Sequence, residues 1–595
     1  MDRGTLSRSR ILWVILLVYF AHALAWVFLL PPWQGPDEPG HYEYAHLLAQ
    51  LRHPPHRHDA QQDVQARIIR SLDRWDFWRL TGQPRPTPLP TSFDQHPFLR
   101  RSGTQLGNET PLYYVIPALL TRLTGDPARA CRFARLWSVL LGAWVVFLAY
   151  RSARYVWPNN TTLQHLFPLT VALLPMPTFI HATFNSNVLA DVWGALFFTS
   201  AWGWLRRPRV SRREGAIYLI LSLGALLIKR TTLLLLPLAP WPLYARARAH
   251  IRGRPFLARI AILLLILPLL IPHIPTWAAD WYKGRTHRPA ARVPVHERGD
   301  DHALLLTSQG PHRPRGYVTQ VLGPSALSEL RGRTVVLQAR VRALAQPTWA
   351  CISVIDARGR SDACAWATST WRTWSLIHPI SPASPYVQVV FGLGNPHEWG
   401  APGALLVDDA ALRPLYGTRN YLKNGAIERP LNRFAYVLHR LQWHTSPRAG
   451  IREHLVHWLL AAAVLFTSFW GNFGWLQYPL PIPVYVLLAL LSAWSVGQWW
   501  RWWRRLPPGP ERDVWTFTGL AGVWFLSAML LAAWWVDWLP QGRYMFPALL
   551  PLVALGLQGL YTAWPERYRA RFPHVVLTAL LSMAIGALLL YGMAL

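Results

Sequence analysis

Long apolar runs recur along this chain, and polar or basic segments separate them. Residues 11–30, 258–274 and 575–595 are each long enough to cross the hydrocarbon core of a bilayer as a helix. The pattern predicts an α-helical polytopic membrane protein with about eleven to thirteen spans. The expected spans are residues 11–30, 133–150, 163–182, 188–205, 216–228, 231–244, 258–277, 482–498, 514–538, 544–564 and 575–595.

The pattern changes between residues 280 and 429, where no segment could span and apolar positions alternate with a period of two. Residues 334–342, 387–391 and 404–408 are therefore predicted to be strands with one buried face. This indicates a β-sandwich inserted between two membrane modules. The expected domains are an N-terminal membrane module at 1–277, the β insert at 280–429 and a C-terminal membrane module at 430–595.

The chain has only three cysteines and no C-x-x-C pair, which argues against a cysteine-based metal or redox centre. Cys351 and Cys364 flank the turn signal at residues 356–359, so a hairpin would place them opposite one another. A disulfide there would fit an oxidising, external location, while two neighbouring free thiols are the alternative.

The net charge of +31 would suggest a nucleic-acid partner in a soluble protein. Here the basic residues lie in short loops between apolar segments, where the positive-inside rule and anionic lipid headgroups account for them. We therefore expect contact with membrane lipids and no nucleic acid. The N-terminus is expected in the cytoplasm, and residues 31–132 and the β insert outside the cell. Balancing the charges of the last loops requires residues 455–470 to dip into the membrane and return.

The apolar run 11–30 resembles a signal peptide at Ala21-His22-Ala23, but it continues to Leu30, so we expect an uncleaved first span. Asp37 and Glu38 follow this span directly, in a segment that contains four prolines, and His41 comes one turn later. Adjacent carboxylates at a bilayer surface are costly to desolvate and suggest chemistry there. Asp37 could instead cap the helix that begins near Pro39.

Other candidate side chains gather on the same predicted side of the membrane. A carboxylate there could deprotonate an acceptor hydroxyl, and cations could neutralise the phosphate of a lipid-linked sugar. Divalent metal binding is possible in this set, although no ligand spacing specifies it, and no cofactor is certain. The set comprises His41, Glu109, Tyr113, Asn185, Asn187, Asp191, Lys229, Arg230, Arg543 and Tyr544, in addition to Asp37 and Glu38.

Several of these residues have simpler interpretations. Paired Lys229 and Arg230 are expected to meet an anionic group, or else to snorkel to the interface, and Arg543 could snorkel in the same way. His41 could be a hydrogen-bonding group on a helix face, and Glu109 could simply precede a helix at its favourable end.

Four motifs carry a resemblance to a known group: residues 36–41, 111–114, 468–475 and 541–547. The chain resembles a bacterial family of predicted multi-pass membrane proteins of unknown function, placed within the GT-C glycosyltransferase superfamily. Such enzymes use polyprenyl-phosphate sugars, and the resemblance implies that Asp37 is the catalytic base or a metal-associated carboxylate, with Glu38 beside it. Asp191 stands a turn after the paired asparagines, a departure from the usual arrangement that leaves its role open.

Residues 330–337 and 403–409 resemble the strands of carbohydrate-binding jelly rolls, so the insert is expected to bind glycan or to act as a spacer. Together these features predict an integral-membrane, inverting glycosyltransferase. It would move a sugar from a polyprenyl-phosphate donor to a glycan, lipid or protein acceptor outside the cytoplasm. The alternative is a non-enzymatic transporter or a protein that binds lipid-linked glycans.

Overall fold

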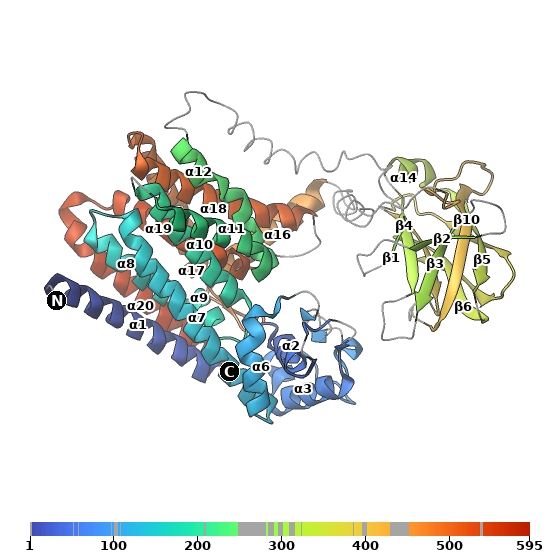
Figure 1. The fold of residues 1–595 in the computed structure, drawn as a ribbon, viewed down its shortest axis with the longest axis horizontal. Coiled ribbons are helices and arrows are strands. Elements are labelled where there is room, and N and C mark those ends of the chain that lie inside the picture. Colours follow the sequence, from blue (N-terminus) through green and yellow to red (C-terminus); the bar gives the residue numbers. More distant parts are fainter. Residues whose placement is uncertain are drawn as a thin grey trace. The chain divides into compact units, whose positions relative to one another are not determined.

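The computed structural model shows a helical unit and a β unit, each of which is compact (Figure 1). The helical unit comprises Met1–Gly253, Leu460–Ala532 and Leu539–Leu595, and the β unit comprises Arg254–Leu459 with Ala533–Trp538. The structure describes residues 3–51, 53–56, 59–96, 98–99, 105–106, 109–207, 210–247, 281–283, 291–295, 302–308, 316–322, 324–344, 346–384, 386–395, 401–428, 451–535 and 540–595.

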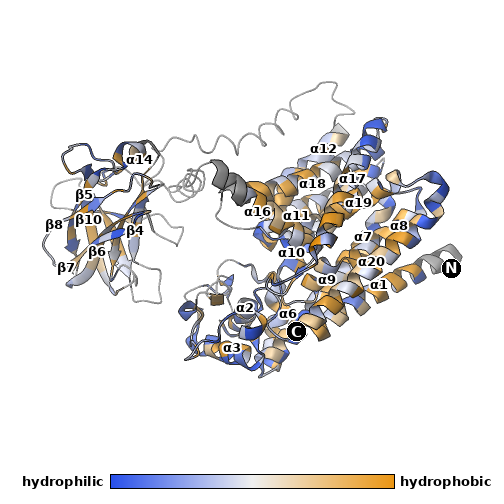
Figure 2. Cartoon of the chain, turned by 180° about the vertical axis from the view of Figure 1, so that it is seen from behind, coloured by the Kyte–Doolittle hydropathy of each residue, from blue (hydrophilic) through white to orange (hydrophobic). Residues whose placement is uncertain are grey.

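Within these described ranges, seven helical segments are long and apolar enough to cross a membrane. An eighth arises if α8 (Thr161–Leu173) and α9 (Pro175–His181), which meet at a bend of 59°, form one broken span. Figure 2 shows that apolar residues dominate these helices. The seven are built on α1 (Arg3–Leu29), α7 (Pro127–Val156), α10 (Asn187–Arg206), α17 (Ile482–Arg505), α18 (Pro510–Trp535), α19 (Leu549–Ala563) and α20 (Phe572–Ala594).

The predicted count of about eleven spans stays a prediction. The segment expected at residues 258–277 lies outside the described residues. The segments expected at 216–228 and 231–244 correspond to α11 (Arg212–Ile228), the 3₁₀ helix η5 (Arg230–Leu238) and α12 (Pro240–Ala247), none of which meets the length and hydropathy of a span. The other expected positions coincide with the apolar helices and the bent pair.

Local sequence explains where several helices begin and break. Asp126 precedes α7 and accepts a hydrogen bond from the Ala128 N–H at 3.1 Å, with proline in the first turn. Asn160 caps α8 in the same way through the Leu163 N–H. The chain bends after Leu174 because Pro175 cannot donate a hydrogen bond to the preceding turn.

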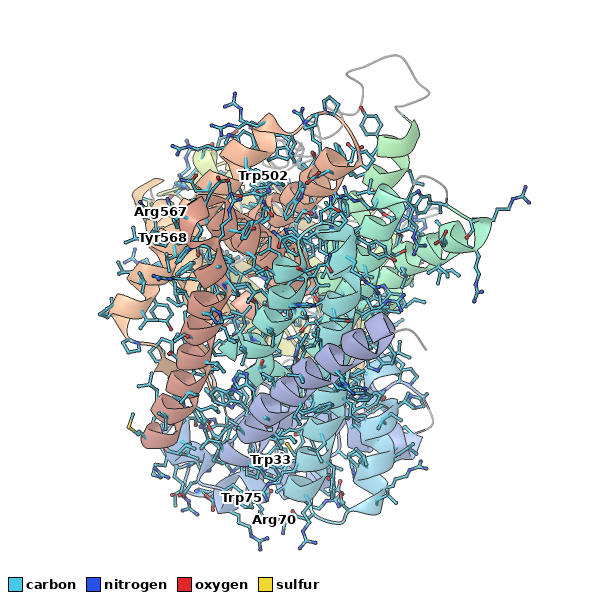
Figure 3. The ribbon with its side chains drawn as sticks, turned by 90° about the vertical axis from the view of Figure 1, so that its left-hand side faces the viewer. Trp33, Arg70, Trp75, Trp502, Arg567 and Tyr568 are labelled. Carbon is cyan, nitrogen blue, oxygen red and sulfur yellow. A yellow bond between two sulfur atoms is a disulfide. The ribbon has the colours of Figure 1, made fainter. Side chains whose placement is uncertain are left out.

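The two ends of the helical unit differ in their balance of charge. Figure 3 shows Trp502, Arg567 and Tyr568 at one end and Trp33, Arg70 and Trp75 at the other. At the Trp33 end several arginines pair with aspartates, whereas the first end carries the loops that join successive long helices, which hold many arginines and few acids. These arginines include Arg151, Arg154, Arg206, Arg504, Arg505, Arg567, Arg569 and Arg571. We call these the basic end and the Trp33 end.

The segment after α1 folds as a small helical layer at the Trp33 end. Short helices cover most of residues 38–51, 62–80 and 111–123. The amphipathic helix α3 buries its apolar face, formed by Val64, Ile68, Ile69 and Leu72. The layer consists of α2 (Glu38–Leu51), α3 (Gln62–Arg74), α4 (Phe77–Leu80), the 3₁₀ helices η2 (Phe93–Gln95) and η4 (Pro111–Tyr114), and α6 (Val115–Leu123).

Helix α16 (Ile451–Trp470) ends at the Trp33 end and leads into a two-stranded hairpin, β11 (Asn472–Phe473) and β12 (Tyr478–Pro479). Trp475 in the hairpin turn donates to the Trp33 carbonyl at 3.0 Å. The hairpin therefore fastens the C-terminal part of the chain onto the loop that follows α1. The predicted dip of residues 455–470 into the membrane stays a prediction.

The β unit consists of two five-stranded antiparallel sheets, in the orders β1-β4-β9-β6-β7 and β2-β3-β10-β5-β8. A short helix, α14 (Pro324–Leu330), follows β4. The strands are β1 (Tyr282–Lys283), β2 (Ala291–Pro294), β3 (His302–Ser308), β4 (Tyr317–Val321), β5 (Thr334–Ala343), β6 (Thr348–Asp356), β7 (Arg360–Ala367), β8 (Arg372–Pro379), β9 (Val387–Leu393) and β10 (Gly403–Pro414).

The two sheets share one apolar core, to which Val354 and Phe391 contribute from the first sheet and Leu337 and Leu405 from the second. The strands predicted at 334–342, 387–391 and 404–408 are confirmed within β5, β9 and β10. Cys351 and Cys364 face each other in the β6–β7 register and form a disulfide, so the free-thiol alternative does not hold in this structure. The finer assignment to a jelly roll stays a prediction.

Candidate functional site

Asp37 sits in a loop whose backbone is held in an unusual conformation. Its φ is 64° and that of Trp33 is 72°, both in the left-handed region, which Asp adopts more readily than most residues and a bulky Trp avoids. A bulky residue persists there only where the surroundings fix it, and such positions concentrate at functional sites. The Asp37 carboxylate is 23% exposed and accepts a hydrogen bond from Arg543 Nη2 at 2.7 Å.

Glu38, the next residue, points the opposite way and is fully buried. Its two oxygens accept from Arg135 of α7, with Nε–Oε1 and Nη2–Oε2 distances of 2.7 Å. The backbone N–H groups of Gly35 and Phe184 donate to the same carboxylate. A side chain at position 35 would overlap Glu38, which explains the glycine there.

Arg135 was not predicted as a site residue, and it carries most of the connections of the loop. Besides Glu38, it donates from Nη1 to the Leu30 carbonyl at 2.6 Å and from Nη2 to the Pro31 carbonyl at 2.8 Å. It thereby joins the end of α1, the start of α2 and the body of α7. The predicted catalytic set contained Glu38, but a carboxylate with four donors on its two oxygens has no lone pair directed at a substrate.

Arg543 belongs to the 3₁₀ helix η9 (Gly542–Ala548) and is 4% exposed. Gly542 lies so close to the Phe469 backbone that no side chain fits there, and its N–H donates to Ser468 Oγ at 2.8 Å. The guanidinium uses Nη2 for Asp37 and for the Tyr544 hydroxyl at 3.3 Å. Its Nε and Nη1 groups are buried and have no hydrogen-bond partner among the described residues.

Lys229, at the start of η5, meets the anionic partner that the sequence led us to expect. Its Nζ lies 3.0 Å from Glu109 Oε1 and 2.5 Å from Ser186 Oγ, and Ser186 donates to Glu109 Oε2 at 2.8 Å. Arg230, its neighbour, is exposed. Ser186 was not predicted as a site residue, since a serine among asparagines carries no distinctive signal.

His41 lies one turn after Asp37, and its Nδ1 is 2.6 Å from the Tyr114 hydroxyl. Burial, with smaller contributions from the positive charges of Lys229 and Arg543, lowers the pKa of His41 well below its usual value. The imidazole is therefore neutral at physiological pH and serves as a hydrogen-bonding group. This agrees with the simpler interpretation of His41, whose ring lies within electrostatic reach of both cations.

The segment between α9 and α10 closes the site from the other side. The Asn185 side chain donates to the Pro36 carbonyl at 3.2 Å, while its N–H donates to the Tyr113 hydroxyl at 3.1 Å. Tyr113 also bonds to Ser138 of α7 at 2.6 Å. Asn185 thus holds the loop that carries Asp37, and Tyr113 links Asn185 to α7.

Asn187 and Asp191 lie in the first turns of α10 and are almost fully buried. Asp191 Oδ2 is 3.2 Å from His181 Nε2, whereas Asp191 Oδ1 and Asn187 Oδ1 have no partner among the described residues. His181 was not predicted, because nothing in the sequence marks it as the partner of Asp191.

Among the described residues, no group of three or more His, Cys, Asp or Glu side chains is arranged to hold a metal ion. The acids that could take that role are engaged elsewhere, since Glu38 pairs with Arg135, Glu109 with Lys229 and Asp191 with His181.

These contacts bring residues from the N-terminal and C-terminal parts of the chain together around the loop that carries Asp37. A family comparison recognises the N-terminal part. Residues 20–283 match the model of a family described as "Predicted membrane protein (DUF2142)". The match covers the segment with Asp37, Glu109, Asp191 and Lys229 and leaves out Arg543. That description, together with the apolar helices, identifies a membrane protein and names no activity.

No curated protein matches the chain. Three similar solved structures are under 25% identical, and their TM-scores are too low to support an argument. A structure titled "CBM4 structure and function" is 17% identical. The match covers 22% of this chain and 84% of that chain, with a TM-score of 0.17. The CBM22-1 xylan-binding domain of Paenibacillus barcinonensis Xyn10C is 14% identical, and the match covers 23% of this chain and 88% of that domain with a TM-score of 0.18. The enzymatically active domain of bacteriophage CBA120 tailspike protein 4 is 12% identical, and the match covers 23% of this chain and 19% of that chain with a TM-score of 0.17.

Proposed function

We propose that the chain is an integral-membrane glycosyltransferase that takes its sugar from a polyprenyl-phosphate donor. The observation that carries this proposal is the pair of Asp37 and Arg543. It combines a partly exposed carboxylate, which can accept a proton, with a buried guanidinium whose Nε and Nη1 nitrogens have no partner among the described residues. Two N–H groups on one guanidinium suit the oxygens of a phosphate.

The proposal places this pair on the outer side of the membrane. Positively charged loops favour the cytoplasmic side, and the basic end of the helical unit lies opposite Trp33, from which the chain leads directly to Asp37 (Figure 3). The Cys351–Cys364 disulfide also fits an oxidising compartment for the β unit. A lipid-linked sugar and an acceptor outside the cytoplasm would then meet at the Trp33 end.

In the proposed reaction the acceptor hydroxyl oxygen attacks the anomeric carbon on the face opposite the phosphate. The new C–O bond forms as the bond from the anomeric carbon to the phosphate oxygen breaks, so the configuration inverts. The hydroxyl proton goes to the Asp37 carboxylate, and the bonding electron pair leaves with the polyprenyl phosphate. Arg543 stabilises the charge that grows on that phosphate, because its donors are already positioned and shielded from water.

The remaining predicted residues take supporting roles in this proposal. Lys229, which contacts Glu109 and Ser186, adds its positive charge beside the phosphate. His41 is neutral and adds no charge of its own. Glu38 positions Asp37 through Arg135 and does not itself take the proton. The acceptor remains a glycan, lipid or protein, and a divalent metal ion remains possible in the loaded site.

The test is Asp37→Asn, which keeps the side-chain shape and the left-handed backbone but removes the proton acceptor. Lipid-linked sugars and surface glycans are compared by mass spectrometry in a deletion strain complemented with the wild type or the variant at equal membrane abundance. We expect transfer to fall by about 10² to 10⁴-fold. Asp63→Asn, at an exposed acid of α3, serves as the matched control and should retain transfer. Full transfer by Asp37→Asn would refute the assignment.

A second candidate function, transport or binding of a lipid-linked glycan, has one observation in its favour. His181 and Asp191 form a buried ionisable pair within the helical unit, and intramembrane charges often line a translocation path. Reconstituted protein separates the two functions. Movement of a lipid-linked sugar across the vesicle without release of polyprenyl phosphate would favour transport, whereas release that depends on Asp37 would favour transfer.

A further inference from the structure

Buried polar groups without a partner are rare in folded proteins and usually mark a missing water or ligand. In the helical unit both kinds of group occur on η9 and α10, two elements that pack against each other. Within the part of the chain that the structure describes, the Arg543 donors Nε and Nη1 and the acceptors Asn187 Oδ1 and Asp191 Oδ1 have no hydrogen-bond partner. A single ligand that satisfies all of them must carry acceptor oxygens at one end and donor groups at the other.

The helical spacing directs these acceptors toward the element that carries Arg543. Asn187, Asp191 and Gly194 are separated by four and then three residues, so they share one face of α10. Gly194 lies against the Pro547 carbonyl of η9 so tightly that no side chain fits between them. The face of α10 with Asn187 and Asp191 is therefore the face that packs toward η9.

The charges near Asn187 Oδ1 and Asp191 Oδ1 determine which kind of ligand group can bind to these oxygens. Lys229 lies close enough that its charge acts on both His41 and Asp191. His181 already occupies the second Asp191 oxygen. A metal cation between Asn187 and Asp191 would be repelled by Lys229, whereas neutral hydroxyl groups would not. The acceptors are thus suited to hydroxyl hydrogens.

We propose that Asn187 and Asp191 bind the ring hydroxyls of the sugar whose phosphate is held by Arg543. The inference rests on the proposed function and gives it a sugar subsite: a hydroxyl-bearing ring attached directly to a phosphate satisfies the donors of η9 and the acceptors of α10 together. Phosphate alone would leave the α10 oxygens unpaired, and a neutral sugar alone would leave the guanidinium unpaired. Each lost pairing in a buried site is expected to weaken binding about tenfold.

The test uses the purified full chain in detergent and measures the shift of its unfolding temperature with soluble probes. Glucose 1-phosphate and mannose 1-phosphate are compared with methyl phosphate, which has the same charge but no ring. We expect at least one sugar phosphate to bind about tenfold more tightly than methyl phosphate. Asn187→Leu and Asp191→Leu should remove this difference and leave the response to methyl phosphate intact.

Thr199→Val is the matched control, because Thr199 Oγ1 is also buried and unpartnered on α10 but lies farther toward the basic end. It should keep the preference for the sugar. Equal shifts with methyl phosphate and both sugar phosphates in the wild type would overturn the subsite, as would an unchanged preference in Asn187→Leu.

The outcome is distinguishable from failure of the proposed function. A response to sugar phosphates that is lost in Asn187→Leu supports the subsite even if Asp37→Asn retains transfer, in which case only the assignment of Asp37 as the proton acceptor falls. If no phosphate probe shifts the unfolding temperature, Arg543 does not bind phosphate, and the subsite and the proposed donor site both fall.

Discussion

Replacing Glu38 by Gln should destabilise the helical unit more than any other conservative change in the loop around Asp37. Both partners of the Glu38–Arg135 pair are fully buried, and the carboxylate also accepts from two backbone N–H groups. A glutamine would present an amide NH₂ to one guanidinium nitrogen and leave the positive charge of Arg135 uncompensated.

Removing one partner of a buried ion pair costs about 3–5 kcal/mol. The ratio of folded to unfolded protein should therefore fall by a factor of about 10² to 10⁴. The assay is unfolding of the purified chain in mixed micelles with increasing SDS, followed by circular dichroism. Asp76→Asn is the control, since Asp76 pairs with Arg79 in an exposed contact of 3.4 Å and the same acid-to-amide change there should cost less than about 1 kcal/mol.

A double variant distinguishes lost pairing from lost packing. Glu38→Leu combined with Arg135→Met replaces both charges by apolar side chains and should lose less stability than either change alone, because no unpaired charge remains. If Glu38→Gln costs no more than Asp76→Asn, or if the effects of the two apolar changes simply add, the reasoning that makes Arg135 the organiser of the loop is wrong.

Three further outcomes follow from the structure. Burial raises the pKa of Glu43 from 4.5 to about 8, so the folded protein keeps a proton that the unfolded chain releases. The free energy of unfolding should therefore fall as pH rises from 4.5 to 8. Glu43→Gln should reduce this pH dependence in unfolding curves measured at several pH values. Arg543→Lys should weaken methyl phosphate binding about tenfold, measured by the same temperature shift, because a lysine lacks the second directed donor. Reduction of the Cys351–Cys364 bond should lower the stability of the β unit by about 3 kcal/mol, measured by the change in its unfolding transition with and without reductant.

Much of the fold could be predicted from periodicity because each signal is local. Apolar runs of span length marked most of the long helices, and alternation marked β5, β9 and β10. The helical status of residues 216–244 was harder to judge, since composition alone does not reveal that η5 is a 3₁₀ segment with an internal proline. The arrangement of the strands into two sheets required pairings between residues far apart in the chain.

The site was predicted in part, and the reason lies in which residues have distinctive chemistry. Asp37 and Arg543 are separated by 506 residues and were both selected, because each stands at the end of an apolar segment where a charge needs an explanation. Arg135 has the same residue type but falls near the start of a long helix, where an arginine is ordinarily read as an interfacial anchor. Its partner is visible only after α7 packs against the loop.

The division of labour between Asp37 and Glu38 could not be read from the sequence, since two adjacent acids have the same intrinsic chemistry. The backbone makes the difference. The left-handed conformation at Asp37 turns its carboxylate toward Arg543 and solvent, while Glu38, as the first residue of α2, points into the helical unit toward Arg135. Both acids meet an arginine, but of these two guanidinium groups only the one opposite Asp37 has donor nitrogens without a partner among the described residues. It follows that one acid fixes the loop and the other remains available for chemistry, so exchanging their environments should abolish function even though both carboxylates are retained.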